Sequence, residues 1–289
     1  MHNNIAFLNN SQGDHLKIHE DIENELREYF QNILPEPEGN RHQAIQAIMQ
    51  HIPKIINDDH NTMLLNLVTL HEVEQAIAKL KDGKASGPDG FISSFFHSFW
   101  EQIKLEVWAL VEESRIMHWI LPSLNMKFLD LIPKEENSSM PEKYRSIALC
   151  NVIYKLISKV IANRLKPLLP LLILLQQIGY VEGCQILDRI ILSDEVIHSL
   201  KHLKKVGMLL KLYLSKAFDK LIWNYINQIL LAFGFSATWT RWIMSLLSSP
   251  NFSILLNVST SLMFRSSRGI CQGDPLSPFL FVLMAEGLS

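Results

Sequence analysis

The sequence predicts an α+β fold in which amphipathic helices pack around a small sheet. Of its 289 residues, 48% are hydrophobic and 19% are charged, which is enough apolar material for one large domain or two small ones. Several long segments carry apolar residues at every third or fourth position, as helices with one buried face do. A few shorter apolar runs end at turn residues, as buried strands do.

The helical spacing recurs along most of the chain. Predicted helices cover residues 17–34, 43–52, 70–80, 103–119, 152–165, 186–203 and 235–247. Pro35, Pro37 and Gly39 end the first of them. Asp58 and Asp59 have polar neighbours, which predicts a solvated turn there and not a metal site.

Predicted strands are fewer and shorter. They cover residues 126–132 and 206–214, and a β pair is formed by 252–258 and 262–265 across residues 259–261. The strand at 206–214 runs into a helix that Ser215 can cap, with apolar residues spaced along 217–233. Side chains at such a strand end lie at the carboxyl edge of a sheet, where sites tend to form, and Asp219 is a carboxylate at that place.

Charge is distributed unevenly. The net charge is −2, whereas nucleic-acid-binding domains are usually basic. Residues 143–181 nevertheless include no acid, and the basic residues in this stretch are Lys143, Arg145, Lys155, Lys159, Arg164 and Lys166. Lys155 and Lys159 share one helix face, which is either a solvated face or a rim that faces phosphates.

The cysteines and the apolar runs exclude several classes of protein. Cys150, Cys184 and Cys271 are too widely spaced for a typical metal site or a disulfide framework. The N-terminus lacks the pattern of a signal peptide, and the run at 168–175 is too short to cross a bilayer. An intracellular protein is expected, cytoplasmic or nuclear, which is neither secreted nor bound in a membrane.

Five stretches carry distinctive combinations of residues. Residues 81–91 join three glycines, one proline and two lysines in one loop, and 131–134 read Leu-Ile-Pro-Lys. The other three are 150–167, 211–223 with Ser-Lys-Ala-Phe-Asp, and 267–281 with Gln-Gly-Asp-Pro-Leu-Ser-Pro. Together they resemble the reverse transcriptases of plant LINE-type (non-LTR) retrotransposons.

This resemblance implies a right-hand fold with helical fingers and an incomplete palm that holds a small mixed sheet. It implies a helical linker region at 1–64, a fingers-like part at 65–205 and a partial palm at 206–289. The hairpin that bears the second pair of catalytic carboxylates, the thumb and the upstream endonuclease are expected to be missing. Five apolar side chains are therefore expected to lack the strands against which they pack: Phe279, Leu280, Phe281, Leu283 and Met284.

The resemblance also assigns site residues. Tyr213 stands where the family has its first catalytic aspartate, and the Leu214 carbonyl belongs to the same metal site. The positions that match the family's nucleotide-binding residues are Lys134, Arg145, Leu214, Phe218, Gln272 and Gly273, with Phe218 as the gate against a 2′-hydroxyl. The expected contacts to nucleic acid are Lys84, Lys155, Lys159, Arg164 and Lys166. The family's cofactor is Mg²⁺, and its partners are an RNA template and a DNA primer.

Departures from the family pattern predict that the chain is inactive. A phenol is a poor Mg²⁺ ligand at neutral pH, so Tyr213 leaves no intact metal site, and Asp219 is expected to be structural. Ser146, Glu182, Cys184 and Cys271 replace a proline, a proline and two arginines of the family. The alternative is a non-catalytic remnant that binds nucleic acid weakly and without sequence preference, or binds protein. No motif of a serine hydrolase, zinc protease or P-loop enzyme occurs.

Overall fold

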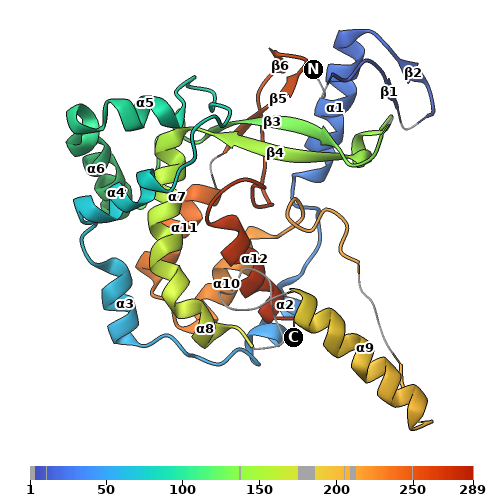
Figure 1. The fold of residues 1–289 in the computed structure, drawn as a ribbon, viewed down its shortest axis with the longest axis vertical. Helices are drawn as coiled ribbons and strands as arrows, with labels where there is room; N and C mark the ends of the chain where they lie inside the picture. Colours follow the sequence, from blue (N-terminus) through green and yellow to red (C-terminus); the bar gives the residue numbers. More distant parts are fainter. Residues whose placement is uncertain are drawn as a thin grey trace.

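The computed structural model describes residues 4–10, 12–136, 138–174, 186–204, 206–208, 213–248 and 250–288. It confirms the predicted α+β class, with helices packed around a mixed sheet. In Figure 1 the long strands cross the upper half of the molecule, and most helices lie below them or to their left. Glu182 and Cys184 lie outside the described residues.

The N-terminal part is a short hairpin followed by three helices. These elements are β1 (Leu8–Asn9), β2 (His15–Leu16), α1 (His19–Ile33), α2 (His42–Met49) and α3 (Asp58–Leu65). The first two helices confirm the predictions at 17–34 and 43–52. Ile22, Leu26 and Phe30 are buried along one face of α1, as the spacing predicted.

α3 shows that the solvated turn predicted at Asp58 and Asp59 is wrong, because both residues begin a helix. Asn57 caps this helix: its side-chain oxygen accepts a hydrogen bond from His60 N at 2.9 Å. Acidic side chains in a first turn interact favourably with the helix dipole. The polar residues that indicated a loop are therefore the signal of a helix N-terminus.

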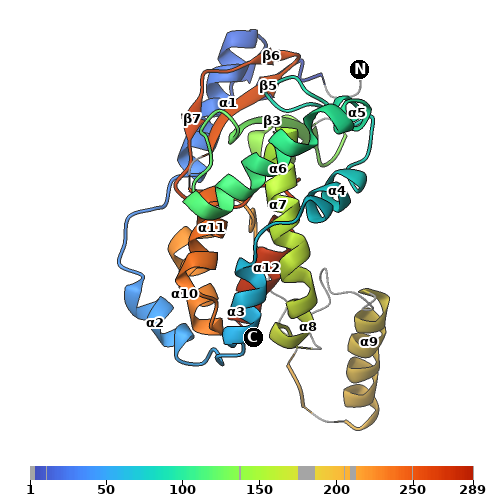
Figure 2. The ribbon, with the colours of Figure 1, turned by 90° about the vertical axis from the view of Figure 1, so that its left-hand side faces the viewer.

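Three helices form a group beside α7 (Val152–Leu165). They are α4 (Leu70–Ala78), α5 (Ser93–Ser98) and α6 (Trp100–Met117), and Figure 2 shows them on the side that faces the viewer. Of these, α4 and α6 contact α7 directly. Thr69 and Glu72 form a capping box at the start of α4, so this helix begins where the sequence predicted. α5 was not predicted, because it is only 6 residues long.

The sheet joins strands that are far apart in the sequence. Its members are β3 (Met126–Pro133), β4 (Tyr144–Cys150), β5 (Asn251–Leu256), β6 (Ser259–Thr260) and β7 (Phe264–Arg265). β3 pairs with β4 antiparallel, from Lys127↔Cys150 to Pro133↔Tyr144. β3 also pairs with β5 in parallel, from Met126↔Asn251 to Asp130↔Leu255, which makes the sheet mixed.

The C-terminal β pair differs in detail from the prediction. β5 pairs with β7 through Phe252↔Phe264, as expected, but it also pairs with β6 through Leu256↔Ser259. The tight turn lies at Asn257 and Val258, whose φ angles of 49° and 75° are both positive, and not at 259–261. Two successive positive φ angles are what a two-residue hairpin turn requires.

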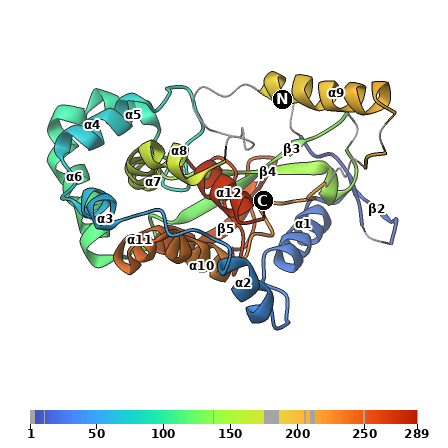
Figure 3. The same ribbon diagram turned by 90° about the horizontal axis from the view of Figure 1, so that it is seen from below.

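The remaining helices lie on one side of the sheet, except for α9. They are α7 (Val152–Leu165), α8 (Leu169–Leu172), α9 (Ile186–His202), α10 (Trp223–Phe233), α11 (Ala237–Leu247) and α12 (Ser277–Glu286). In Figure 3 α12 lies in the centre, next to α10. In Figures 1 and 2 α9 projects away from the other elements. None of the described helices is both long and apolar enough for a membrane span.

The strand predicted at 206–214 is wrong for the residues that are described there. Residues 206–208 and 213–214 form no strand, and 209–212 lie outside the described residues. The outer edge of β4 is already bonded, because Ala148 N donates to Gln272 O at 2.8 Å and Lys216 Nζ donates to Tyr144 O at 3.0 Å. The following helix begins at Trp223 and not near Ser215, since Lys216 has a left-handed φ of 54°.

One hydrophobic core extends from the N-terminal hairpin to α12. Leu280, Leu283 and Met284 are at most 1% exposed, and Phe279 and Phe281 are partly buried against the core. The expectation that these side chains lack packing partners is therefore wrong. α12 packs against α10, and Tyr225 Oη donates to Met284 O at 2.9 Å. The sheet also crosses the predicted boundary at 205/206, because β5 lies beside β3.

Candidate active site and nucleic-acid surface

The Gly-Asp-Pro turn before α12 is anchored by a buried carboxylate. Asp274 Oδ2 accepts hydrogen bonds from Ser277 N and Ser277 Oγ, both at 3.0 Å, which caps the helix. Asp274 Oδ1 accepts from Ser158 Oγ of α7 at 2.5 Å, and Ser158 Oγ accepts from Leu276 N at 3.1 Å. The turn is therefore fixed to α7 as well as to α12.

Two glycines let this turn approach neighbouring backbone. Gly273 has a φ of 110°, and a Cβ atom on it would lie 3.0 Å from Ala148 O of β4. Gly269 has a φ of 92°, and a Cβ atom there would lie 2.8 Å from Asp219 O. Both conformations and both contacts favour glycine. Gly273 thus packs against β4, and the Gln272 side chain beside it is exposed.

The segment around Phe218 is held against the same turn. Ile270 N donates to Phe218 O at 2.9 Å, and Gly269 N donates to Leu221 O at 2.7 Å. The Phe218 ring stacks on Phe281 of α12, with ring centroids 4.7 Å apart. Three of the predicted nucleotide-binding residues, Phe218, Gln272 and Gly273, therefore come from two segments that touch.

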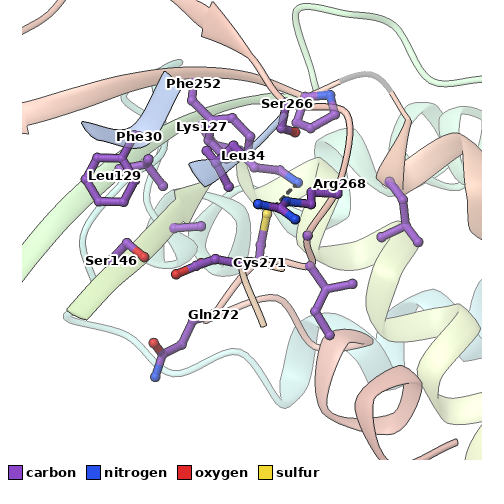
Figure 4. Close-up of a pocket in the computed structure, with 16 residues that line it drawn as sticks. Phe30, Leu34, Lys127, Leu129, Ser146, Phe252, Ser266, Arg268, Cys271 and Gln272 are labelled. Atoms are coloured by element: carbon purple, nitrogen blue, oxygen red, sulfur yellow. Dashed lines mark hydrogen bonds between the residues drawn. The ribbon is translucent and has the colours of Figure 1, made fainter. Parts of the chain in front are cut away.

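Asp219 faces a small cavity between the sheet and this turn. The cavity has a volume of about 30 Å³, and its lining includes Lys127, Ser146, Arg268 and Cys271 (Figure 4). That volume holds one or two water molecules and is far too small for a nucleotide. Asp219 thus lines this cavity as a partly buried carboxylate, and its structural role stays a prediction.

Burial raises the pKa of Asp219 above its ordinary value, although Lys216 and a hydrogen bond from Ser146 oppose this rise. Because the pKa in the folded state lies above the unfolded value, stability is fully present below the unfolded pKa and declines as the pH rises through the folded pKa. We expect the Asp219→Asn variant to be more resistant to urea than the parent chain at pH about 7, with the difference disappearing near pH about 4.

Urea unfolding at both pH values tests this expectation. Asp194→Asn on α9 is the control, because Asp194 is exposed and should leave the midpoint unchanged at either pH. A lower midpoint for Asp219→Asn at neutral pH would mean that the charged carboxylate is needed for the fold.

Tyr213 and Leu214 lie outside this cavity. They are 86% and 63% exposed, and neither contributes to the cavity lining. Tyr213 and Leu214, the two positions that the resemblance assigns to the metal site, are thus at the surface and do not line the cavity beside Asp219.

Lys134 lines a larger hollow at the other end of the β3–β4 pair. This hollow has a volume of about 650 Å³, room enough for a nucleotide, and residues 4–7 form its other wall. Lys134 Nζ donates to Glu142 O at 2.7 Å, while Glu135 and Glu136 also line the hollow. Arg145 lies opposite Ile132 in the β3–β4 pair, and its side chain is exposed.

Lys127 is a buried cation that the sequence analysis missed. It is 2% exposed, its Nζ lies 3.3 Å from Cys271 Sγ, and it sits 4.0 Å from the centroid of the Tyr154 ring. Lys127 lies on the buried face of β3 together with Leu129 and Leu131, at every second position of the strand. This period of two was the available signal that the lysine points inward.

Arg164 does not belong in the predicted set of nucleic-acid contacts. It is 9% exposed, and all the donors of its guanidinium group are hydrogen-bonded within the protein. Its Nε donates to Glu72 Oε1 at 2.7 Å, and its Nη2 donates to Glu72 Oε2 at 2.9 Å. Its remaining donors bond the carbonyl oxygens of Leu64, Asn66 and Leu67. Arg164 therefore connects α7 to the α3–α4 connection and is not available to a phosphate.

The predicted lysines remain at the surface. Lys84 and Lys166 are exposed, while Lys155 and Lys159 are half-buried. The pKa of Lys159 is lowered by burial and by the positive charges of Lys79 and Lys166. This region therefore gathers like charges from α4 and α7, an arrangement that an anion would relieve.

The family follows from these motifs and from comparison with known proteins. A family model described as reverse transcriptase (RNA-dependent DNA polymerase) matches residues 132–289, which hold the end of β3, all of β4, Asp219 and the Gly-Asp-Pro turn. The chain belongs to the reverse transcriptase family.

Relatives of this reverse transcriptase domain are proteins of non-LTR retrotransposons. It is 26% identical over 98% of its length to the "Transposon TX1 uncharacterized 149 kDa protein" of Xenopus laevis, of which it covers 21%. It is 30% identical over 55% of its length to the Pol polyprotein of element R2 from Popillia japonica, and it covers 22% of that protein. For element R2DM of Drosophila melanogaster the identity is 26% over 81% of the chain, with 22% of the relative covered. The chain thus spans about a fifth of the length of these relatives.

Reverse transcriptases generally use divalent metal ions, and the described residues around Asp219 do not fit such a site. Among the described residues, no three side chains of His, Cys, Asp or Glu gather where they could hold a metal. Asp219 is a single carboxylate in a cavity whose other charged side chains, Lys127 and Arg268, are cationic. Mg²⁺ is held by oxygen ligands, and cations in the same cavity oppose its binding.

Proposed function

We propose that this reverse transcriptase domain binds nucleic acid but does not catalyse polymerisation by itself. The family reaction adds a deoxynucleotide to a primer 3′-hydroxyl on an RNA template. The observation that supports inactivity is Tyr213 itself, a phenol at the position of the family's first catalytic aspartate, with no group of three possible metal ligands among the described residues. The relatives come from a frog and insects, so a plant source stays a prediction.

The proposal gives each part of the chain a role. Lys134 and Arg145, at the end of the β3–β4 pair, are the cations that would face a triphosphate. Phe218, stacked on Phe281, and the exposed Gln272 would lie beside the sugar and the base. Residues 65–205 would act as fingers and 206–289 as part of the palm. The RNA template and DNA primer of such a protein imply that it acts inside the cell, in the cytoplasm or nucleus.

The proposed binding is to single-stranded nucleic acid, through the lysines of the α4–α7 surface. Half-buried Lys159 lies near Lys79 and Lys166 without an acidic neighbour that raises its pKa, which favours phosphate binding over a merely solvated face. Binding of this kind releases counterions, so the affinity should fall linearly with salt on a double logarithmic plot.

We expect charge reversal at Lys155 and Lys159 together to weaken the binding of a single-stranded RNA about tenfold or more and to reduce the salt slope by about two. Fluorescence anisotropy across a salt series measures both quantities. Lys17→Glu combined with Lys54→Glu changes the net charge equally at other sites and is the matched control. An affinity that does not change between low and high salt would contradict phosphate contacts through this surface.

A further inference from the structure

Three phenylalanines form a ladder at the surface beside the lysine-rich face. The centroids of Phe91 and Phe95 lie 4.7 Å apart, and those of Phe95 and Phe99 lie 5.0 Å apart. Phe91 is 46% exposed and Phe99 is 48% exposed, so both ends of the ladder are open to solvent. Large aromatic side chains are usually more buried than this. Solvent-exposed rings that lie next to one another provide a surface on which another ring can stack.

The ladder is held rigidly from below. Phe96 is 5% exposed and packs edge-on against Phe95, with ring centroids 5.5 Å apart and an interplanar angle of 86°. Phe91 N donates to Asp89 Oδ1 at 3.0 Å, and Asp89 N donates to Asn151 Oδ1 at 3.2 Å. A ladder anchored to the core and to the start of α7 loses little conformational freedom when a ligand binds.

The loop that leads into the ladder approaches α7 closely. A Cβ atom on Gly87 would lie 2.4 Å from Asn151 N, so only a glycine fits at this position. His97 Nδ1 lies 2.9 Å from Asp82 Oδ1, which joins α5 to the loop. The glycines and the proline of residues 81–91 therefore fix the position of the ladder relative to the lysines of α7.

The charges around the ladder favour a polyanion. Lys81 and Lys84 lie in the loop before it, while Lys79 and Lys159 belong to the adjoining α4–α7 surface. Within the described parts of the chain, no carboxylate oxygen lies within 4.0 Å of the ammonium group of any of these four lysines. The acids of the loop are otherwise engaged: Asp82 with His97, and Asp89 with Phe91 N.

We propose that Phe91, Phe95 and Phe99 form a stacking platform for unpaired bases of a single-stranded nucleic acid whose phosphates contact the neighbouring lysines. Aromatic rings beside a cationic surface are the arrangement that binds single strands without sequence preference, because every base has a face that can stack. Duplex bases are not available to such a platform. The proposal rests on the nucleic-acid binding proposed above and adds that the unpaired bases, and not only the phosphates, are recognised.

The test compares two oligonucleotides of equal length and charge, one with bases and one abasic. We expect the Phe91→Leu/Phe99→Leu variant to bind the base-containing strand about tenfold more weakly than the parent and to bind the abasic strand equally well. Leucine keeps the apolar character at these half-exposed positions but removes the ring, and Phe91→Trp/Phe99→Trp should restore or strengthen the binding. Circular dichroism and thermal melting check that each variant is folded.

The outcomes distinguish base stacking on the phenylalanines from phosphate binding by the lysines. If the Lys155 and Lys159 charge reversal weakens both oligonucleotides while the leucine variant binds like the parent, the platform is overturned and phosphate binding stands. If the leucine variant loses affinity for both oligonucleotides equally, the rings support the fold and do not stack with bases, which also overturns the proposal. If neither oligonucleotide binds the parent chain, the proposed function fails together with the platform. If the leucine variant binds both oligonucleotides like the parent but self-associates less, the phenylalanines form a protein contact, and the proposal is overturned.

Discussion

Replacing Tyr213 by aspartate should restore polymerase activity only when the protein also receives the segment that follows this region in an active relative. The clamping of two metal ions requires carboxylates on both sides, and among the described residues of this chain no three possible ligands gather at one place. In a chimera joined after Leu288, we expect Tyr213→Asp to raise primer extension by roughly a thousandfold or more over the chimera that keeps Tyr213. Extension of a labelled DNA primer on an RNA template, in the presence of Mg²⁺, measures the gain.

Three matched proteins complete this experiment. The unmodified chain and the Tyr213→Asp chain without the added segment should both stay at background. Catalytic groups that act as a unit give little activity when only one of them is restored. The Tyr213→Asn chimera should also stay near background, since an amide lacks the negative charge. Template-dependent extension by the unmodified chain would refute the proposed inactivity and would require other metal ligands.

Removing the Arg164 side chain should destabilise the fold more than any other change to the predicted nucleic-acid contacts. Arg164→Met leaves Glu72 without its partner and deprives the carbonyl oxygens of Leu64, Asn66 and Leu67 of a donor. Loss of one partner from a buried ion pair costs about 3–5 kcal/mol of unfolding free energy, and the low end of this range applies here because the Glu72 side chain is 30% exposed. Urea unfolding followed by circular dichroism measures this loss, and Lys84→Met, at an exposed position of equal charge, should change it little.

The same pair gives a pH dependence of known sign. The pKa of Glu72 is lowered: burial alone would raise it, but hydrogen bonds from Arg164 and Thr69 and the charge of Arg164 outweigh burial. A folded pKa below the unfolded one contributes stability above the unfolded value of about 4.3, and this stability is lost as the pH falls through the folded pKa. The gap in stability between the parent and Arg164→Met should therefore narrow in acid. A gap that is constant with pH would show that the arginine acts through its carbonyl contacts alone.

The helices were predicted well because their periodicity is local. An apolar stripe such as Ile22, Leu26 and Phe30 forms one face of a helix, and that face is buried against the core. The spacing within one segment is therefore enough to predict the helix. The sheet was predicted less well, since pairing is not local: β4 was not predicted as a strand, and 206–214 was predicted to be one. An apolar run forms a strand only where a partner edge is free, and the outer edge of β4 is bonded to Gln272 and Lys216.

The site shows the same difference between local and distant effects. The motifs located Asp219, Gln272 and Gly273, and the structure brings their segments together. Composition could not distinguish the lysines at the surface from Arg164, because the partner of Arg164 lies 92 positions away in Glu72. Lys127 was missed for a related reason: its burial depends on Cys271 and Tyr154, which come from other elements.

The parallel pairing of β3 with β5 has a consequence for how the chain folds. β3 lies between β4 and β5, so its two neighbours are made at very different times during synthesis. β4 follows β3 directly and can pair with it at once, whereas β5 emerges only after the whole of residues 134–250. Until then the inner edge of β3 has unpaired backbone groups, which is a state prone to aggregation. The pairing of distant segments also slows folding, so the β3–β4 hairpin should form early and the complete sheet late.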